Sequence, residues 1–596
     1  MAVADAGGRG ARRGVRRGRR EADLAPPNGP RRGGGALAAA RGTLAAPVAT
    51  TAVLALAFWL ANVGARGFSF SPDSMSYAAL ARGLDGGQWF TSRILAWGTA
   101  AGQFRGEWPP FYPALVALGH ALGLSLPWSE FVLSGLGFVA AAVLGLLAVQ
   151  TAGAEVAWAA VPLLAGLPIG LYVAGYGWSE PLCLALLGLH YWLAALAVRA
   201  AGAGRPVAGL LFGQGCAAGL AFLDRYAAAA FLPAALALPL VLAACRQPAA
   251  REEGPRRGRR EPAPAGWLLR ASGAAALGVG LPVVPWTAAC FALTGHVGSN
   301  YLEPGAGLRG ALRMCALTLR QVGGWLLTAQ ASGLPSPGAA LRLVLALAAC
   351  AALGLALPLL GLRRRPSGPL LPRAVLGGMC AADALLSAAL LIGWRARYLF
   401  DPLDPRLLAP SLYAAVLAGL VGLALVPWRE ARHLLVLPLS AVLLWHGLQW
   451  SLSAVMAPQI PAALAGPWCT PGADGDCGMM DWLALHTGGG DLIVGNASFT
   501  INFQLGRTTE DVETYPYNPN PTAADLRAWT AAWEAHQPGG RVFVVLDADT
   551  GPLDGSGPVM AALWAEPPPA VAGVAEALLA SGPAYRIWLL TPTGAG

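Results

Sequence analysis

The sequence predicts a polytopic α-helical membrane protein with a small C-terminal α/β domain, and three observations support this prediction. Of the 596 residues, 55% are hydrophobic and only 12% are charged, whereas about a quarter of an ordinary soluble domain is charged. The apolar residues are concentrated in long runs, as in membrane-spanning helices. Beyond residue 450, short β-like runs alternate with Gly, Pro, Asp and Asn. We therefore expect three parts, at 1–42, 43–450 and 451–596.

The first part, 1–42, carries ten Arg residues among Gly, Ala and Pro, and almost no bulky apolar residue. Such a composition predicts a disordered tail, and its positive charge favours a cytoplasmic N-terminus. The formal net charge of the whole chain is +9, but the basic residues cluster beside apolar runs. The charge therefore indicates membrane topology, and we expect no nucleic-acid partner.

The second part contains twelve apolar runs that could enter a bilayer, whose hydrocarbon core is about 30 Å thick. Arg clusters at 246–260, 363–373 and 429–432 indicate cytoplasmic loops. The run at 110–124 is short and begins with several Pro residues, so we expect a re-entrant or half-crossing piece there. With 11 or 13 crossings the C-terminus lies outside the cytoplasm. The runs are 42–63, 110–124, 129–150, 155–174, 179–199, 207–222, 225–245, 270–294, 338–362, 374–393, 406–427 and 433–450.

The third part, 451–596, should form a small extracytoplasmic α/β domain. The runs DLIVGN, RVFVVLDAD and AYRIWLL are predicted strands, and helices are expected near 479–487, 522–536 and 570–581. Cys469 and Cys477 are the two cysteines in a polar segment. Because no second pair and no His cluster lies nearby, they suit a disulfide better than a zinc site.

The first external loop, 65–110, contains the sequence FSFSPDSMSYAALARGLDGGQWF. Ser71 is a predicted N-cap, followed by Pro72 at the first helical position, and the apolar residues recur at helical spacing. We expect a short amphipathic helix in the membrane surface. Asp73 in its first turn either complements the helix dipole or accepts a proton from a substrate hydroxyl. Glu107 is a second candidate acid.

Within the apolar half, charged residues are few, and an ionisable residue in a membrane is a functional hypothesis by default. Glu180 lies in GYGWSEP, and Asp224 and Arg225 lie in FLDRY. Asp224 and Arg225 could also simply pair with one another or with another buried charge. Asp383, in MCAADALL, could be a hydrogen-bonding residue in helix packing.

The segment WRARYLFDPLDPRLLAP, at 394–410, places Arg395, Arg397 and Arg406 in a loop expected to lie outside the cytoplasm. Arg residues are normally enriched in cytoplasmic loops, so a cluster of them outside the cytoplasm suggests a functional role. A guanidinium can bind phosphate through two hydrogen bonds, so we expect a lipid-phosphate site. The nearby acids Asp401 and Asp404 could instead neutralise the loop.

Five motifs, taken in order, resemble a known family. PDSMSYAALARGL, WPPFYPALVALGHALGL, GWSEPL, LDRYAAAAFLP and DPLDPRLLAPSLY are similar to segments of bacterial relatives of protein O-mannosyltransferases and lipid A aminoarabinose transferases. Those proteins are glycosyltransferases of the GT-C fold, and the resemblance covers roughly residues 45–430. The C-terminal segment DWLALHTGGGDLIVGNASFTINFQLGR also looks like the soluble external domain of some of them.

The resemblance implies a polyprenyl-phosphate-sugar donor, an acidic residue in the first external loop, and an inverting displacement at the anomeric carbon. Asp73 matches that acid by position. The family's usual acidic pair is here Asp73 followed by Ser74, which leaves open both the second acid and a divalent metal. No cofactor is otherwise expected.

The expected reaction has Asp73 taking the acceptor proton, while cationic side chains stabilise the leaving phosphate. Two alternatives remain open: a transporter or flippase of lipid-linked sugars, which should show broken helices in pseudo-symmetric positions, and a non-catalytic membrane scaffold. The candidate residues are Asp73 and Glu107 for catalysis, Arg225, Arg395, Arg397 and Arg406 for phosphate binding, and Tyr77, Glu180, Asp224 and Tyr398 for the rest of the pocket.

Overall fold

A computed structural model of the protein describes residues 33–91, 94–95, 106, 108–153, 157–245, 265–295, 297, 307–313, 316, 370–397, 405–423, 476–511, 523–547, 574–581 and 585–592. The predicted spans at 338–362 and 433–450 lie outside these residues, as do the Arg clusters at 246–260 and 429–432. The chain divides into two compact units, Met1–Ala46 and Pro47–Gly596. All candidate site residues lie in the second unit.

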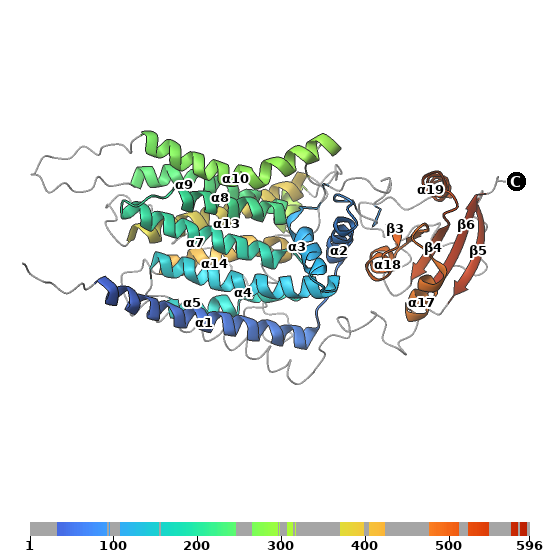
Figure 1. The fold of residues 1–596 in the computed structure, drawn as a ribbon, viewed down its shortest axis with the longest axis horizontal. Helices are drawn as coiled ribbons and strands as arrows, with labels where there is room; N and C mark the ends of the chain where they lie inside the picture. The colour runs from blue at the N-terminus through green and yellow to red at the C-terminus, as the bar shows by residue number, and fades with distance from the viewer. Residues whose placement is uncertain are drawn as a thin grey trace, which may run out of the picture. The chain divides into compact units, whose positions relative to one another are not determined.

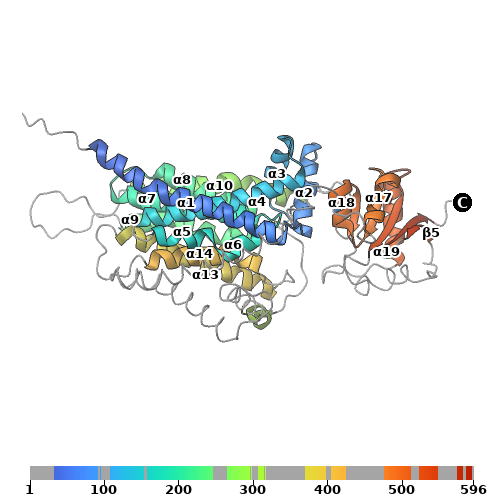
Figure 2. The same cartoon turned by 90° about the horizontal axis from the view of Figure 1, so that it is seen from below.

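Long helices run side by side through this unit, as Figures 1 and 2 show. In the part of the chain that the structure describes, seven helical segments are long and apolar enough to cross a membrane. The protein is therefore a multi-pass helical membrane protein. The helices of this bundle, including the shorter α8 and α9, are α1 (Gly33–Arg66), α4 (Leu126–Ala152), α7 (Glu180–Gly202), α8 (Ala208–Asp224), α9 (Leu232–Cys245), α10 (Ala265–Thr294), α13 (Leu370–Arg397) and α14 (Pro405–Leu423).

Small residues let neighbouring helices approach closely, most visibly between α8 and α10. Gly215 and Gly219 are four residues apart on α8. A methyl group at Gly215 would lie 2.6 Å from the carbonyl oxygen of Ala275. Close backbone contact of this kind supplies the van der Waals packing that holds membrane helices together.

Two helices differ from the predicted spans. The first, α1, begins at Gly33, inside the stretch expected to be disordered, because the Ala-rich sequence that follows favours a helix. The expected span at 155–174 is broken into α5 (Ala157–Ala165) and α6 (Pro168–Val173). Leu167 is extended at the break, since the residue before a proline is pushed away from helical geometry.

Two short helices come before α4: α2 (Pro72–Asp85) in the first loop, and α3 (Phe111–Ala121) in the apolar run that follows it. The 11 residues of α3 reach only about 16 Å at the rise of an α-helix, which fits the expected half-crossing piece. Residues on several faces of α2 are buried, including Met75, Ala78 and Ala79, which lie off the predicted apolar face. The helix is packed within the protein and does not lie freely in the membrane surface.

The C-terminal part of the chain forms a sheet with the strand order β1-β3-β2-β4-β6-β5. Strand β2 pairs in parallel with β3 and β4, and β6 runs antiparallel to β4 and β5. The predicted strands at DLIVGN, RVFVVLDAD and AYRIWLL are confirmed. The strands are β1 (Ile94–Leu95), β2 (Leu492–Gly495), β3 (Thr508–Asp511), β4 (Val542–Asp547), β5 (Val574–Ser581) and β6 (Tyr585–Pro592); the helices are α17 (Asp476–His486), α18 (Ser498–Leu505) and α19 (Ala523–His536).

The helix expected near 570–581 is wrong, because Val574–Ser581 forms strand β5. Its Ala, Leu and Glu residues favour a helix in isolation. Pairing with β6, with a bulge between Leu578 and Ala580, overrides that local preference. Strands β1 and β3 and helix α18 were not expected from the sequence. Of these, β1 comes from the first loop and joins β3.

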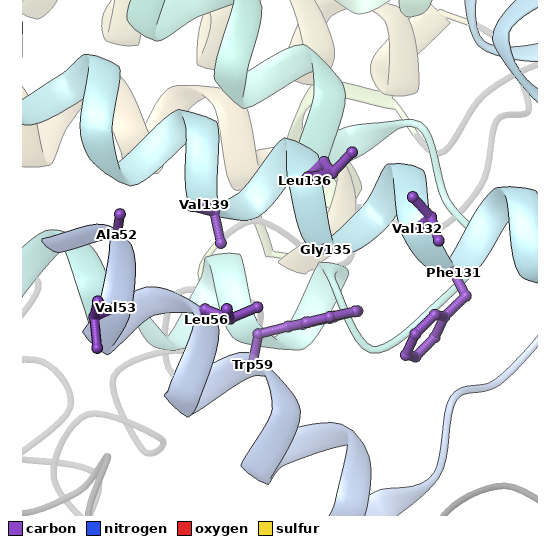
Figure 3. A pocket seen from close by; sticks show the side chains of 9 residues that line it. All are labelled: Ala52, Val53, Leu56, Trp59, Phe131, Val132, Gly135, Leu136 and Val139. Carbon is purple, nitrogen blue, oxygen red and sulfur yellow. The ribbon is translucent and has the colours of Figure 1, made fainter. Parts of the chain in front are cut away.

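An apolar groove of about 340 Å³ runs between α1 and α4. Figure 3 shows Trp59 and Phe131 at one end and Ala52 and Val53 at the other. Apolar side chains line it, so it offers no group for acid–base chemistry. The lining residues are Ala52, Val53, Leu56, Trp59, Phe131, Val132, Gly135, Leu136 and Val139.

Candidate active site

The N-terminus of α2 is fixed by side-chain hydrogen bonds. Ser71 caps the helix and forms a capping box with Ser74, as its sequence position predicted. The indole of Trp178, just before α7, donates a hydrogen bond of 2.6 Å to the Ser71 hydroxyl. Asp73 lies in this first turn. Its carboxylate is therefore presented from a short, well-anchored piece of backbone.

Four charged side chains meet beside this turn, and each comes from a different element. Asp73 of α2 pairs with Arg406, in the first turn of α14. Glu180, the first residue of α7, pairs with Arg225, which directly follows α8. The Arg406 Nε atom lies 3.6 Å from Glu180 Oε1, which links the two pairs. We refer to Asp73, Glu180, Arg225 and Arg406 as the four-charge network.

Solvent reaches the members of this network unequally. The Asp73 side chain is 20% exposed and that of Arg406 is 9% exposed, whereas the Glu180 side chain is only 1% exposed. Glu180 is therefore the inner acid, held between two guanidinium groups, and Asp73 is the acid that a bound molecule could reach. Paired acids and arginines of this kind neutralise one another in a medium of low polarity.

Aromatic side chains surround the network. The Arg406 guanidinium lies 5.0 Å from the centre of the Trp178 ring, a cation–π contact. The Tyr77 hydroxyl lies 3.4 Å from the Ser179 hydroxyl. Burial raises the pKa of the Tyr77 phenol well above its usual range, and the charge of Asp73 adds to the effect. Tyr77 therefore keeps its proton and can act as a hydrogen-bond donor, not as a base.

Comparison with solved structures identifies the fold. ArnT from Cupriavidus metallidurans bound to undecaprenyl phosphate matches with a TM-score of 0.52 and 14% identity, over 92% of this chain and 99% of that one. The apo state of the same protein matches with a TM-score of 0.52 and 16% identity, over 92% and 98%. ArnT is a GT-C glycosyltransferase. The chain has the GT-C fold.

Other matches are weaker. The mycobacterial arabinofuranosyltransferase AftD gives a TM-score of 0.47 with 16% identity, over 91% of this chain and 40% of that one. The archaeal oligosaccharyltransferase AglB from Archaeoglobus fulgidus gives 0.46 with 14% identity, over 87% and 71%. No protein-family model and no curated protein matches the chain.

Within this GT-C fold, the remaining candidate residues have different places. Asp224 is fully buried at the end of α8, directly before Arg225. Arg395 and Arg397 do not lie in a loop as predicted, because α13 continues to Arg397; both are in its last turn, where Arg395 is buried and Arg397 is exposed. Glu107 and Tyr398 lie outside the described residues, as does Cys469. The Cys477 side chain is also outside them, so the expected disulfide stays a prediction.

Sequence reasoning missed Glu130, near the start of α4. This carboxyl group is fully buried, and neither oxygen has a hydrogen-bond partner among the described residues. It lies against Gly177, where a methyl group would overlap the carboxylate, and Gly177 in turn lies next to Ser74. A single acid in the apolar run of α4 was the available signal. The supporting role of Trp178 and Ser179 was also missed, because neither is ionisable.

A second polar cluster lies between α7, α8 and α13, and we call it the mid-bundle cluster. Tyr191 donates a hydrogen bond of 3.1 Å to Asp383. His190 Nε2 lies 3.9 Å from Asp383 Oδ2, and the Gln214 side-chain nitrogen lies 3.2 Å from His190 Nδ1. The expected packing role of Asp383 agrees with this contact between helices. For metal binding, no group of three or more His, Cys, Asp or Glu side chains occurs within the described ranges.

Proposed function

We propose that the protein is a glycosyltransferase that moves a sugar from a polyprenyl-phosphate-sugar donor to a lipid, glycan or protein acceptor, with inversion at the anomeric carbon. One observation carries the proposal. The partly exposed carboxylate of Asp73 lies in direct contact with Arg406, in a network that also contains Arg225. A base and two guanidinium groups are the parts that such a displacement requires.

In the proposed reaction the acceptor oxygen or nitrogen attacks the anomeric carbon and loses its proton to Asp73. The bond between that carbon and the phosphate oxygen breaks, and its electron pair leaves with the polyprenyl phosphate. The phosphate gains negative charge as it departs, and Arg406 and Arg225 stabilise that charge. Asp73 is the base because it is the more exposed acid of the network, while Glu180 is enclosed.

Several features support a donor of this type. The ArnT structure with the same fold contains undecaprenyl phosphate, which is the kind of product that the proposed reaction releases. Arg395 and Arg397, in the last turn of α13, could extend the cationic surface toward a lipid phosphate. In this proposal, Asp224 and Tyr77 form the remaining wall of the donor site beside the four-charge network.

We place this reaction at the extracytoplasmic face of the cell membrane, with the C-terminal domain on the same side. The Arg-rich first 42 residues favour a cytoplasmic N-terminus. A lipid-linked donor and an external acceptor can then reach the same site. Labelling of single introduced cysteines from either side of intact cells would test this topology.

The test of the proposed function is transfer by the purified protein. The full chain in lipid nanodiscs is incubated with a panel of polyprenyl-phosphate sugars and with an extract of cell-envelope acceptors, and released polyprenyl phosphate is measured. We expect release with one class of donor and only when acceptors are present. Movement of the intact donor across a vesicle membrane without release would instead support a flippase, and binding without either would support a scaffold.

A further inference from the structure

The side chain of Arg82 connects α2 to the C-terminal domain. From the last turn of α2, its guanidinium donates to the backbone carbonyls of Asn502, at 2.7 Å, and Phe503. Both carbonyls belong to the last turn of α18, and the Asn502 carbonyl also accepts the backbone N–H of Gly506. A guanidinium there also complements the negative end of the helix dipole.

Helix α18 also contacts α2 near the N-terminal end of α2. Phe503 is 4% exposed and belongs to the same buried apolar cluster as Met75, Tyr77 and Ala78 of α2. It also lies 5.0 Å from the ring of Phe70, just before α2 begins. These contacts span most of α2, from the turn that carries Asp73 to the turn that carries Arg82.

These contacts with α18 stabilise α2, which has only 14 residues. An isolated helix of that length has little stability of its own. Asp73 and Arg82 are about 14 Å apart along the helix axis, so a tilt at one end displaces the other. Arg406 and Arg225 belong to other helices. Movement of α2 would therefore change the distance from Asp73 to the arginines without moving the arginines themselves.

We propose that Arg82 is a positioning residue, through which α18 holds α2 and its Asp73 in place beside Arg406. This inference rests on the proposed function and extends it, because it makes the C-terminal domain part of the active-site geometry. A misplacement of the base by about 1 Å can cost about 100-fold in rate.

The experiment measures transfer and lipid-phosphate binding separately in Arg82→Gln. We expect kcat to fall by about 10- to 100-fold, while the affinity for undecaprenyl phosphate stays within about twofold, since the phosphate-binding arginines do not move. Arg82→Lys should recover part of the rate because an ammonium group can still donate to one carbonyl. Phe503→Ala should give a similar loss that does not add fully to that of Arg82→Gln.

The matched control is Arg541→Gln, which removes an ion pair with Asp491 inside the C-terminal domain and leaves α2 untouched. It should keep the wild-type rate. Hydrogen–deuterium exchange provides a readout that needs no activity: Arg82→Gln should speed exchange of the α2 amides, and Arg541→Gln should not. The inference is overturned if Arg82→Gln keeps the wild-type kcat, or if undecaprenyl phosphate binding falls as much as kcat. If Asp73→Asn abolishes transfer but Arg82→Gln has no effect, the proposed function is supported and the positioning role of Arg82 is refuted.

Discussion

The four-charge network and the mid-bundle cluster both gather polar side chains from several helices of a membrane protein, yet their chemistry differs. The network pairs two acids with two arginines, and Asp73 keeps partial exposure. The mid-bundle cluster contains Asp383, Tyr191, His190 and Gln214, which are all fully or almost fully buried, and hydrogen bonds dominate it.

This difference teaches that burial alone does not mark a reaction site. A buried acid in a membrane is a functional hypothesis, and Asp383 satisfies that criterion as well as Glu180 does. Asp73 differs from both because it has an accessible edge, with cations beside it that a substrate phosphate could use. The mid-bundle cluster offers no such access, so we interpret it as a device for helix packing.

Among the variants that sharpen this contrast apart from Asp73 itself, the largest effect is expected from Arg406→Gln. The variant removes the cation that touches Asp73 and lies near Glu180, so charge on the leaving phosphate loses its closest stabilising group. We expect transfer to fall by about 100- to 1000-fold, with weaker binding of undecaprenyl phosphate. Titration of labelled undecaprenyl phosphate and initial-rate assays measure both.

Arg205→Gln is the control for that variant, because Arg205 is an exposed residue in the turn between α7 and α8. It should change neither binding nor rate. Equal losses in Arg205→Gln and Arg406→Gln would show that general charge, not the network, governs phosphate binding.

A smaller and different effect is expected from Tyr191→Phe in the mid-bundle cluster. The variant removes the hydrogen bond between α7 and Asp383 of α13, which should lower stability by about 0.5–2 kcal/mol. The transfer rate of the folded protein should stay unchanged. Thermal unfolding in detergent measures the stability, and rate assays below the unfolding temperature measure the transfer rate. A large loss of rate with unchanged stability would contradict the packing role of the mid-bundle cluster.

The smallest effect concerns the C-terminal domain, where Arg541 donates two side-chain hydrogen bonds to Asp491. Burial alone would raise the pKa of Asp491, but hydrogen bonds from Arg541 and from backbone N–H groups outweigh it and lower that pKa. Because the folded pKa is lowered, the stabilisation is present above the unfolded value of about 3.9 and is lost as pH falls through the folded value.

We therefore expect amide protection of β2 and β4 in the full chain to decrease as the pH falls below about 4. In Arg541→Gln that acid-induced loss should be smaller, with reduced protection already at neutral pH. Half of the Arg541 side chain is exposed, so the effect should be modest and should weaken with salt. An identical pH dependence in the variant would contradict this interpretation of the pair.

The local features of the molecule could be predicted from the sequence. Apolar length predicted the helices, and Ser71 with Pro72 predicted the start of α2. The errors came where a distant partner decides the structure. Strand β5 depends on β6, and the burial of α2 depends partly on α18, whose Phe503 is hundreds of residues away along the chain.

The candidate site shows the same limit. Composition and motif order brought Asp73, Glu180, Arg225 and Arg406 to attention separately, but no local pattern could show that Arg406 meets Asp73, 333 residues away. From the sequence, Arg395 and Arg397 were as good candidates for phosphate binding as Arg406. The contribution of Arg82 was invisible for the same reason, because its partners are backbone carbonyls of a helix that the sequence did not reveal.

The central claim is that the Asp73 carboxylate accepts the proton of the acceptor during sugar transfer. The most direct measurement compares the rate of polyprenyl phosphate release in Asp73→Asn and in Asp85→Asn, a change at an exposed acid at the other end of the same helix. The account predicts a loss of about 100- to 10,000-fold for Asp73→Asn, with undecaprenyl phosphate still bound, and a near wild-type rate for Asp85→Asn. Full transfer activity in Asp73→Asn would contradict the account.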